Sequence, residues 1–155
     1  MRFAVLRPLA GHARRAVVAS NAPSCVLRVD TARHSLLLTG DIGLAEERAL
    51  IEREPGAGLR ADGLVVAHHG SGTSSGAGWL DAVRPHAAVF QLGYANRYRH
   101  PQAEVWERYG GAGILRYRTD ETGAVTMTTS PAGYVLSMFR QAEPRYWRAR
   151  PLAPR

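Results

Sequence analysis

Lysine is absent from this sequence: all 20 basic residues are arginine, set against 13 acidic ones, for a formal net charge of +7. This absence excludes a Walker A lysine, a Schiff-base lysine and a lysine general base. Arginine presents a planar fork of donors that fits phosphate, so the charge favours a polyanionic partner such as DNA. GC-rich codons produce the same arginine-only composition, and composition alone leaves both interpretations open.

Cysteine and long apolar runs are also scarce. Cys25 is the only cysteine, which excludes a disulfide framework and a thiolate zinc cluster. Its apolar neighbours predict a buried structural thiol. No apolar run approaches the ~20 residues that span a bilayer, and the arginine-interrupted N-terminus lacks the apolar core of a signal peptide. The 155 residues therefore predict one soluble globular domain.

Short apolar runs alternate with amphipathic segments. Strands are predicted at 2–7, 24–29, 34–40 (buried on both faces), 63–68 and 87–93, helices at 44–53, 78–85 and 101–111, and a closing hairpin at 113–118 with 124–129. This order predicts an α/β layered fold in which helices cover a sheet. We divide the chain into a domain at 1–133 and a basic tail, rich in proline and arginine, at 134–155.

Three polar segments follow predicted strand ends, where α/β folds usually place ligands. The first is Thr39-Gly40-Asp41. A carboxylate directly after a buried strand can ligate a metal, and the glycine allows close backbone approach. The alternative is that Asp41 caps the helix that begins near Gly43.

The second segment is V-V-A-H-H-G-S-G-T-S-S, residues 65–75. Adjacent histidines at a strand end point to opposite sides, so one of His68 and His69 can face a metal. Ser71 and Thr73 lie in a loop whose amides and hydroxyls can receive a phosphate or orient the imidazoles. The alternative is one buried structural histidine beside one on the surface.

The same loop contains G-x-S-x-G at residues 72–76, the pattern of a serine-hydrolase nucleophile elbow at Ser74. An elbow requires the serine on a sharp turn directly after the strand, and several loop residues intervene here. The pattern therefore ranks below a metal site.

The third segment is N-R-Y-R-H-P, residues 96–101. Pro101 at the first helical position would place His100 at the cap, beside free backbone N–H groups and the positive end of the helix dipole. With Arg97 or Arg99 nearby, such a position suits phosphate. The alternative is a helix cap on a basic loop.

Taken in order, these motifs resemble the C-terminal metallo-β-lactamase-like domain of the ComEC family of competence proteins, which carry transforming DNA across the inner membrane. The resemblance covers about residues 2 to 129. Its segments are N-x-x-S-x-V-L at 21–27, L-L-L-T-G-D at 36–41, E-x-x-L at 47–50, H-H-G-S-x-T-S within 68–75 and N-R-Y-x-H-P at 96–101. It implies an α/β fold that is the C-terminal half of an αββα sandwich, a mixed sheet with flanking helices.

The resemblance also implies roles for the metal site. Asp41 would be the metal-bridging carboxylate, and His68 or His69 a ligand, with His69 preferred because it adjoins the glycine. Asn21 would lie near the metals and the substrate. The complete domain would hold two divalent ions, zinc or manganese, which activate water and clamp a phosphodiester for in-line attack.

For the substrate, the resemblance implies that His100 and Asn96 act on the DNA phosphate, with Ser71, Thr73 and Arg97 as further phosphate contacts. The family's His-x-His-x-Asp-His motif is missing, because none of the six histidines lies in such a pattern. We therefore expect a nuclease domain that is inactive alone. Its partners would be the upstream half of the same domain and a membrane channel region. The alternative is a non-catalytic, basic DNA-contacting module or an inactive remnant.

Overall fold

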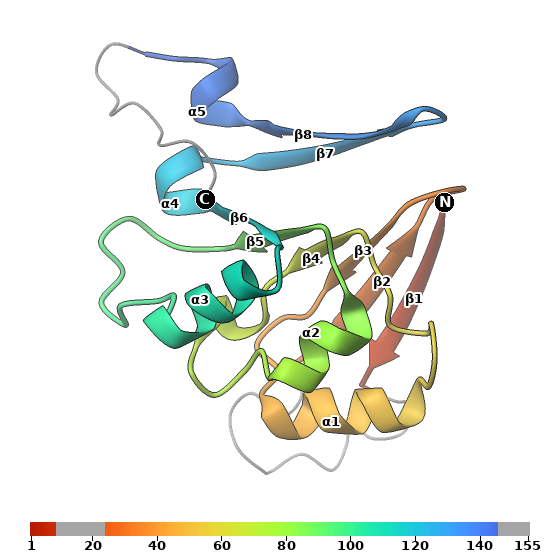
Figure 1. Cartoon of the computed structure of the whole chain (residues 1–155). Coiled ribbons are helices and arrows are strands. Elements are labelled where there is room, and N and C mark those ends of the chain that lie inside the picture. Colours follow the sequence, from red (N-terminus) through yellow and green to blue (C-terminus); the bar gives the residue numbers. More distant parts are fainter. Residues whose placement is uncertain (9–23, 146–155) are drawn as a thin grey trace.

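The computed structural model describes residues 1–8 and 24–145 (Figure 1). The strands are β1 (Arg2–Arg7), β2 (Val26–Asp30), β3 (Ser35–Leu38), β4 (Gly63–Val65), β5 (Ala87–Phe90), β6 (Leu115–Arg118), β7 (Val125–Ser130) and β8 (Gly133–Met138). The helices are α1 (Leu44–Arg53), the 3-10 turn η2 (Ala67–Gly70), α2 (Ala77–Val83), α3 (Ala103–Gly111), α4 (Thr119–Thr122) and α5 (Phe139–Ala142).

Six strands form one mixed sheet in the order β1-β2-β3-β4-β5-β6. β1, β2 and β3 pair antiparallel, whereas β3 to β6 are all parallel. Parallel neighbours need a crossover connection, and α1, α2 and α3 supply the three crossovers. These helices lie on one face of the sheet (Figure 1). The predicted α/β class with a mixed sheet and flanking helices is therefore confirmed.

The core lies between the sheet and these helices. Leu37 of β3, Leu64 of β4 and Phe90 of β5 are fully buried, as are Trp79 of α2 and Tyr109 of α3. Each side chain of this size contributes roughly 1.5–3 kcal/mol when it leaves water. This packing holds the carboxyl ends of the parallel strands in place, and those ends carry the candidate site.

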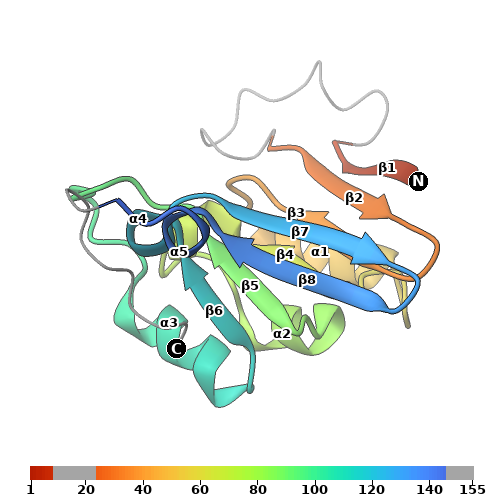
Figure 2. The same cartoon turned by 90° about the horizontal axis from the view of Figure 1, so that it is seen from above.

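The other face of the sheet is partly covered by the antiparallel β7–β8 hairpin, which Figure 2 shows lying over the middle strands. A groove of about 360 Å³ separates the hairpin from the sheet, with Leu36, Val65 and Val89 on one side and Met127 and Leu136 on the other. The predicted burial of β3 on both faces is thus only partial, because Leu36 opens onto this groove.

One prediction about the C-terminal third is wrong. Residues 113–118 do not form a hairpin with 124–129, because β6 joins the main sheet beside β5 and β7 pairs with β8 instead. The described part of the segment that we assign to a tail, residues 134–145, contains most of β8 and all of α5. The short helix α4 follows β6 directly, so the chain leaves the sheet rather than turning back along it.

Smaller corrections concern a strand end, a helix start and the cysteine. β4 ends at Val65 and α3 begins at Ala103. Cys25, predicted to be buried, is exposed. Across residues 1–8 and 24–145, none of the helices has the length and apolar character needed to cross a bilayer.

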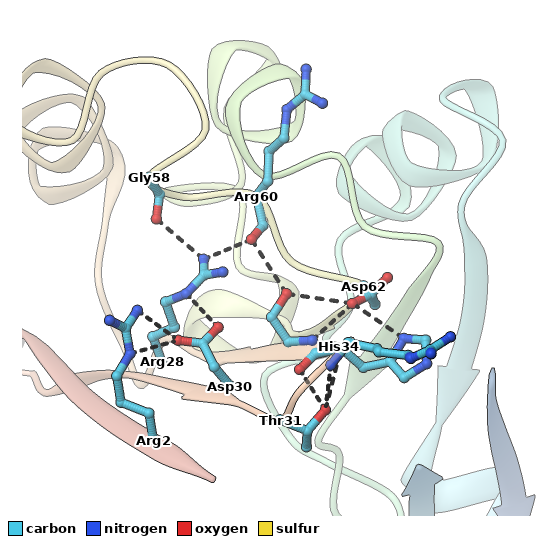
Figure 3. A network of polar contacts seen from close by, with 10 residues as sticks. Arg2, Arg28, Asp30, Thr31, His34, Gly58, Arg60 and Asp62 are labelled. Carbon is cyan, nitrogen blue, oxygen red and sulfur yellow. Dashed lines mark hydrogen bonds and ion pairs between the residues drawn. The ribbon is translucent and has the colours of Figure 1, made fainter. Parts of the chain in front are cut away.

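A polar network occupies the amino ends of the parallel strands (Figure 3). The Asp62 carboxylate accepts a hydrogen bond from the Ser35 N–H at 2.8 Å. It also lies 3.7 Å from Nδ1 of His34 and 3.8 Å from Nδ1 of His86. Because these residues precede β3, β4 and β5, the two histidines lie at the end of the sheet opposite the candidate site and belong to the fold.

Candidate functional site

Three loops meet at the carboxyl ends of β3, β4 and β5, on the left in Figure 1. Backbone hydrogen bonds tie them together. The His68 N–H donates to the Gly40 carbonyl at 2.9 Å, and the Gln102 N–H donates to the Gly70 carbonyl at 2.9 Å. The three segments therefore converge because their strands are parallel neighbours.

The structure brings Asp41 and His69, two of the predicted metal ligands, close together. Nε2 of His69 lies 3.4 Å from Oδ1 of Asp41, and both side chains are a little under half exposed, at 46% and 43%. Nδ1 of His69 lies 2.8 Å from the Gln91 carbonyl oxygen. A carbonyl only accepts hydrogen bonds, so Nδ1 carries a proton, and Nε2 is the ring nitrogen that faces Asp41.

This geometry suits two ligands of one metal ion. Ligand bonds of about 2.0–2.2 Å at tetrahedral angles place neighbouring donor atoms roughly 3.4 Å apart. Metal-bound histidines almost always donate their other ring N–H to a carbonyl or carboxylate, as His69 does to Gln91. Among residues 1–8 and 24–145, however, no group of three or more metal-ligating side chains comes together. Among the described residues, Asp41 and His69 can thus supply two metal ligands, and the remaining coordination positions have no protein ligand.

The two histidines do not lie at a strand end, which corrects the prediction. They occupy η2, with left-handed φ values of 49° for His68 and 57° for His69. Left-handed backbone costs a non-glycine residue about 1–3 kcal/mol and gathers at functional sites. The turn separates the two rings, because His68 lies toward Thr73, with Nδ1 to Oγ1 at 3.5 Å, while His69 lies toward Asp41.

The loop after η2 is held by internal hydrogen bonds. Oγ of Ser71 lies 3.1 Å from Oγ1 of Thr73. The fully buried Ser74 hydroxyl lies within hydrogen-bond distance of two carbonyl oxygens, Ala67 at 2.9 Å and Ser71 at 3.0 Å. A buried hydroxyl that donates to backbone carbonyls stabilises the loop and is not free to attack a substrate. The interpretation of Ser74 as the nucleophile of an elbow is therefore wrong.

Glu47 is a residue of this site whose role the sequence did not reveal. Its buried carboxylate accepts the backbone N–H groups of Ser75 at 2.5 Å and Gly76 at 2.9 Å. It thereby anchors the end of the histidine loop to α1. The sequence shows Glu47 three residues before Leu50 on a predicted helix. It does not show toward which segment the Glu47 side chain points.

Burial raises the pKa of the Glu47 carboxyl, against the lowering effect of its two N–H donors and of Arg108, while the charge of Glu46 adds to the rise. A carboxyl with a raised folded-state pKa favours folding most below its unfolded value of 4.5, and this contribution is lost as pH rises through the folded-state pKa. We therefore expect Glu47→Gln to remove the pH-dependent contribution of this carboxyl to the free energy of unfolding.

The measurement is urea unfolding of wild type and Glu47→Gln between pH 4 and pH 7. The free energy of unfolding of the wild type, relative to the variant, should fall as the pH rises. The exposed Glu52→Gln on the same helix is the matched control and should track the wild type. A difference between wild type and Glu47→Gln that stays constant with pH would contradict the assignment.

The loop after β5 places His100 and Asn96 differently from the prediction. α3 begins at Ala103 with Gln102 as its cap, so His100 is not a helix cap. The Asn96 amide pairs with the His100 backbone instead: its Oδ1 accepts the N–H at 2.8 Å, and its Nδ2 donates to the carbonyl at 2.9 Å. Asn96 thus shapes the loop that presents His100.

The His100 ring lies 6.1 Å from the His68 ring, measured between centroids. Burial, followed by the charges of His68 and His69, lowers the pKa of His100. Arg97, predicted to bind phosphate, donates a hydrogen bond to the Tyr98 hydroxyl at 2.7 Å. Asn21, the remaining predicted site residue, lies outside the described residues.

Comparison with known proteins gives consistent matches. No family model matches the chain. It is 38% identical over 149 residues to competence protein ComA of Neisseria gonorrhoeae, covering 96% of this chain and 21% of that protein. It is 33% identical over 125 residues to ComE operon protein 3 of Bacillus subtilis, covering 81% of this chain and 15% of that protein. It is 40% identical over 90 residues to recombination protein 2 of Haemophilus influenzae, covering 58% of this chain and 11% of that protein.

The chain therefore spans about a fifth or less of the length of these relatives. The similarities support a relationship to competence proteins, in agreement with the resemblance found in the motifs.

Proposed function

We propose that this chain is part of a DNA-uptake protein and that its three converging loops contribute to a metal-dependent phosphodiesterase site. The names of two relatives, competence protein ComA and ComE operon protein 3, support the uptake role. The mixed sheet, with helices on one face and a partly open opposite face, is compatible with half of a metallo-β-lactamase-like sandwich. The upstream half of such a domain and a membrane channel region would complete the protein.

The observation that carries this proposal is the Asp41–His69 pair. Its 3.4 Å separation and the hydrogen bond from Nδ1 of His69 to Gln91 leave two donor atoms ready for a divalent ion such as zinc or manganese. Bound there, such an ion supplies a Lewis acid for phosphodiester hydrolysis. The open ligand positions, including those of a second ion, would be filled from the upstream half of the domain.

The chain's own residues position the DNA phosphate. With its lowered pKa, His100 stays neutral near pH 7 and keeps one ring N–H to donate to a phosphate oxygen. Asn96 holds the backbone of His100 in place. Ser71 and Thr73 orient each other's hydroxyls beside His68 and offer further donors to the same phosphate.

The test is degradation of a single-stranded oligodeoxynucleotide by the full-length polypeptide that carries this chain. We expect degradation with manganese or zinc, its loss on addition of EDTA, and its return when the metal is restored in excess. Because the proposed site depends on a metal, degradation that continues unchanged in EDTA would refute the proposal.

A further inference from the structure

A second cavity adjoins the Asp41–His69 pair. It has a volume of about 240 Å³, and its lining includes His69 from the η2 turn together with Leu92, Tyr98 and His100 from the loop after β5. Pockets for drug-sized ligands run from roughly 300 to 1,000 Å³. The size therefore suits a smaller group, such as one flat ring system.

Tyr98 gives this cavity an aromatic wall. Its side chain is 62% exposed, yet several contacts hold the ring. It lies nearly parallel to the His100 ring, with 5.9 Å between centroids and 16° between planes. The Arg97 guanidinium lies 4.9 Å from the ring centroid and donates to its hydroxyl. An exposed aromatic ring that is held in place is a preformed stacking surface.

The surroundings of the cavity favour a nucleotide over an uncharged ligand. Arg97 and Arg99 are exposed on the same loop, and the exposed Gln91 also lines the cavity. Aromatic rings that stack on bases, beside arginines that follow the backbone, are how proteins bind single-stranded nucleic acid without reading its sequence. The bases of a duplex are stacked and paired, so only an unstacked base can enter the cavity.

We propose that this cavity holds one unstacked base of a DNA single strand, with Tyr98 as its stacking wall. The inference rests on the proposed function and refines it, because it adds a base-binding cavity beside the Asp41–His69 pair. With the base beside His69 and His100, the adjoining phosphate would lie near the Asp41–His69 pair.

The experiment compares the binding of two oligonucleotides to the full chain in EDTA, so that no hydrolysis occurs. One is a labelled oligodeoxythymidine and the other is an abasic strand with the same number of phosphates. Stacking on an aromatic side chain is worth enough to change affinity about 5- to 100-fold per base. We expect wild type and Tyr98→Phe to prefer the base-bearing strand by this factor, and Tyr98→Ala to bind both strands equally.

Tyr94 supplies the matched control. It is 90% exposed on the same loop, and Tyr94→Ala should keep the preference of the wild type. Equal binding of both strands by wild type would overturn the base-binding proposal while leaving metal-dependent hydrolysis standing. Loss of the preference in Tyr98→Phe would also overturn it, because the hydroxyl rather than the ring would then be responsible. Absence of binding to either strand would overturn the base-binding proposal as well, because stacking of a base on Tyr98 needs no metal, and metal-dependent hydrolysis would still stand.

Discussion

The substitution Asp41→Asn is expected to lower metal-dependent DNA hydrolysis by the full-length polypeptide about a hundredfold to a thousandfold. Asp41 follows β3 and presents Oδ1 3.4 Å from Nε2 of His69. An amide keeps the shape of the carboxylate but loses its charge, which weakens the hold on a divalent ion. Metal stabilisation of a phosphodiester transition state is worth several kcal/mol, and each 1.36 kcal/mol is about tenfold in rate.

The readouts are the rate of oligonucleotide degradation and the affinity for manganese or zinc. Both should fall in Asp41→Asn. The matched control is Asp81→Asn, because Asp81 is exposed on α2, away from the three loops. If Asp41→Asn hydrolyses DNA as fast as wild type, Asp41 is not a metal ligand and the proposed site is wrong. The helix-cap alternative for Asp41 does not hold either, because the cap residue of α1 is Gly43 and its backbone N–H donates to Glu46.

The substitution Gly70→Ala is expected to destabilise the protein by about 2–5 kcal/mol. Gly70 ends η2 with a φ of 83°, where an alanine costs roughly 1–2 kcal/mol. Its Cβ would also lie 2.8 Å from Cβ of Pro101 and 2.9 Å from ring atoms of Phe90. Overpacking of this kind adds about 1–3 kcal/mol, because the buried ring has little room to move.

Urea unfolding measures this effect, with Gly78→Ala as the matched control. Gly78 lies inside α2, and a Cβ there meets no atom within 4 Å. Alanine also favours helix over glycine, so this variant should be as stable as wild type or more stable by about 0.5–1 kcal/mol. If Gly70→Ala unfolds at the same urea concentration as Gly78→Ala, the close packing of η2 against Phe90 and Pro101 is wrong.

Several parts of the fold could be predicted from local pattern. The helix expected at 44–53 is α1 at those bounds, and the strand expected at 2–7 is β1. In both, spacing of apolar residues and the neighbouring turn residues act over a few positions of the chain. The convergence of three polar segments was also predictable, because strands that alternate with helices become parallel neighbours.

Other parts could not be predicted because they depend on distant partners. The apolar residues of β6 and β7 predict strands but do not say which strand each pairs with, and β8 was not predicted as a strand. Pairing was decided by the space left beside β5 and over the open face of the sheet. Likewise, Glu47 shares the sequence pattern of any helical glutamate, and only the folded chain brings it to the backbone of Ser75 and Gly76.

The sequence by itself determined the class of fold, the three candidate loops and the residue types that could bind metal and phosphate. The tertiary structure decided which of them meet. It set His69 rather than His68 against Asp41, turned Asn96 onto the backbone of His100, and made Tyr98 a wall of the second cavity. Residue type and periodicity are local properties of the chain. The direction of a side chain in a loop, by contrast, follows from backbone angles and contacts that exist only after distant segments have packed together.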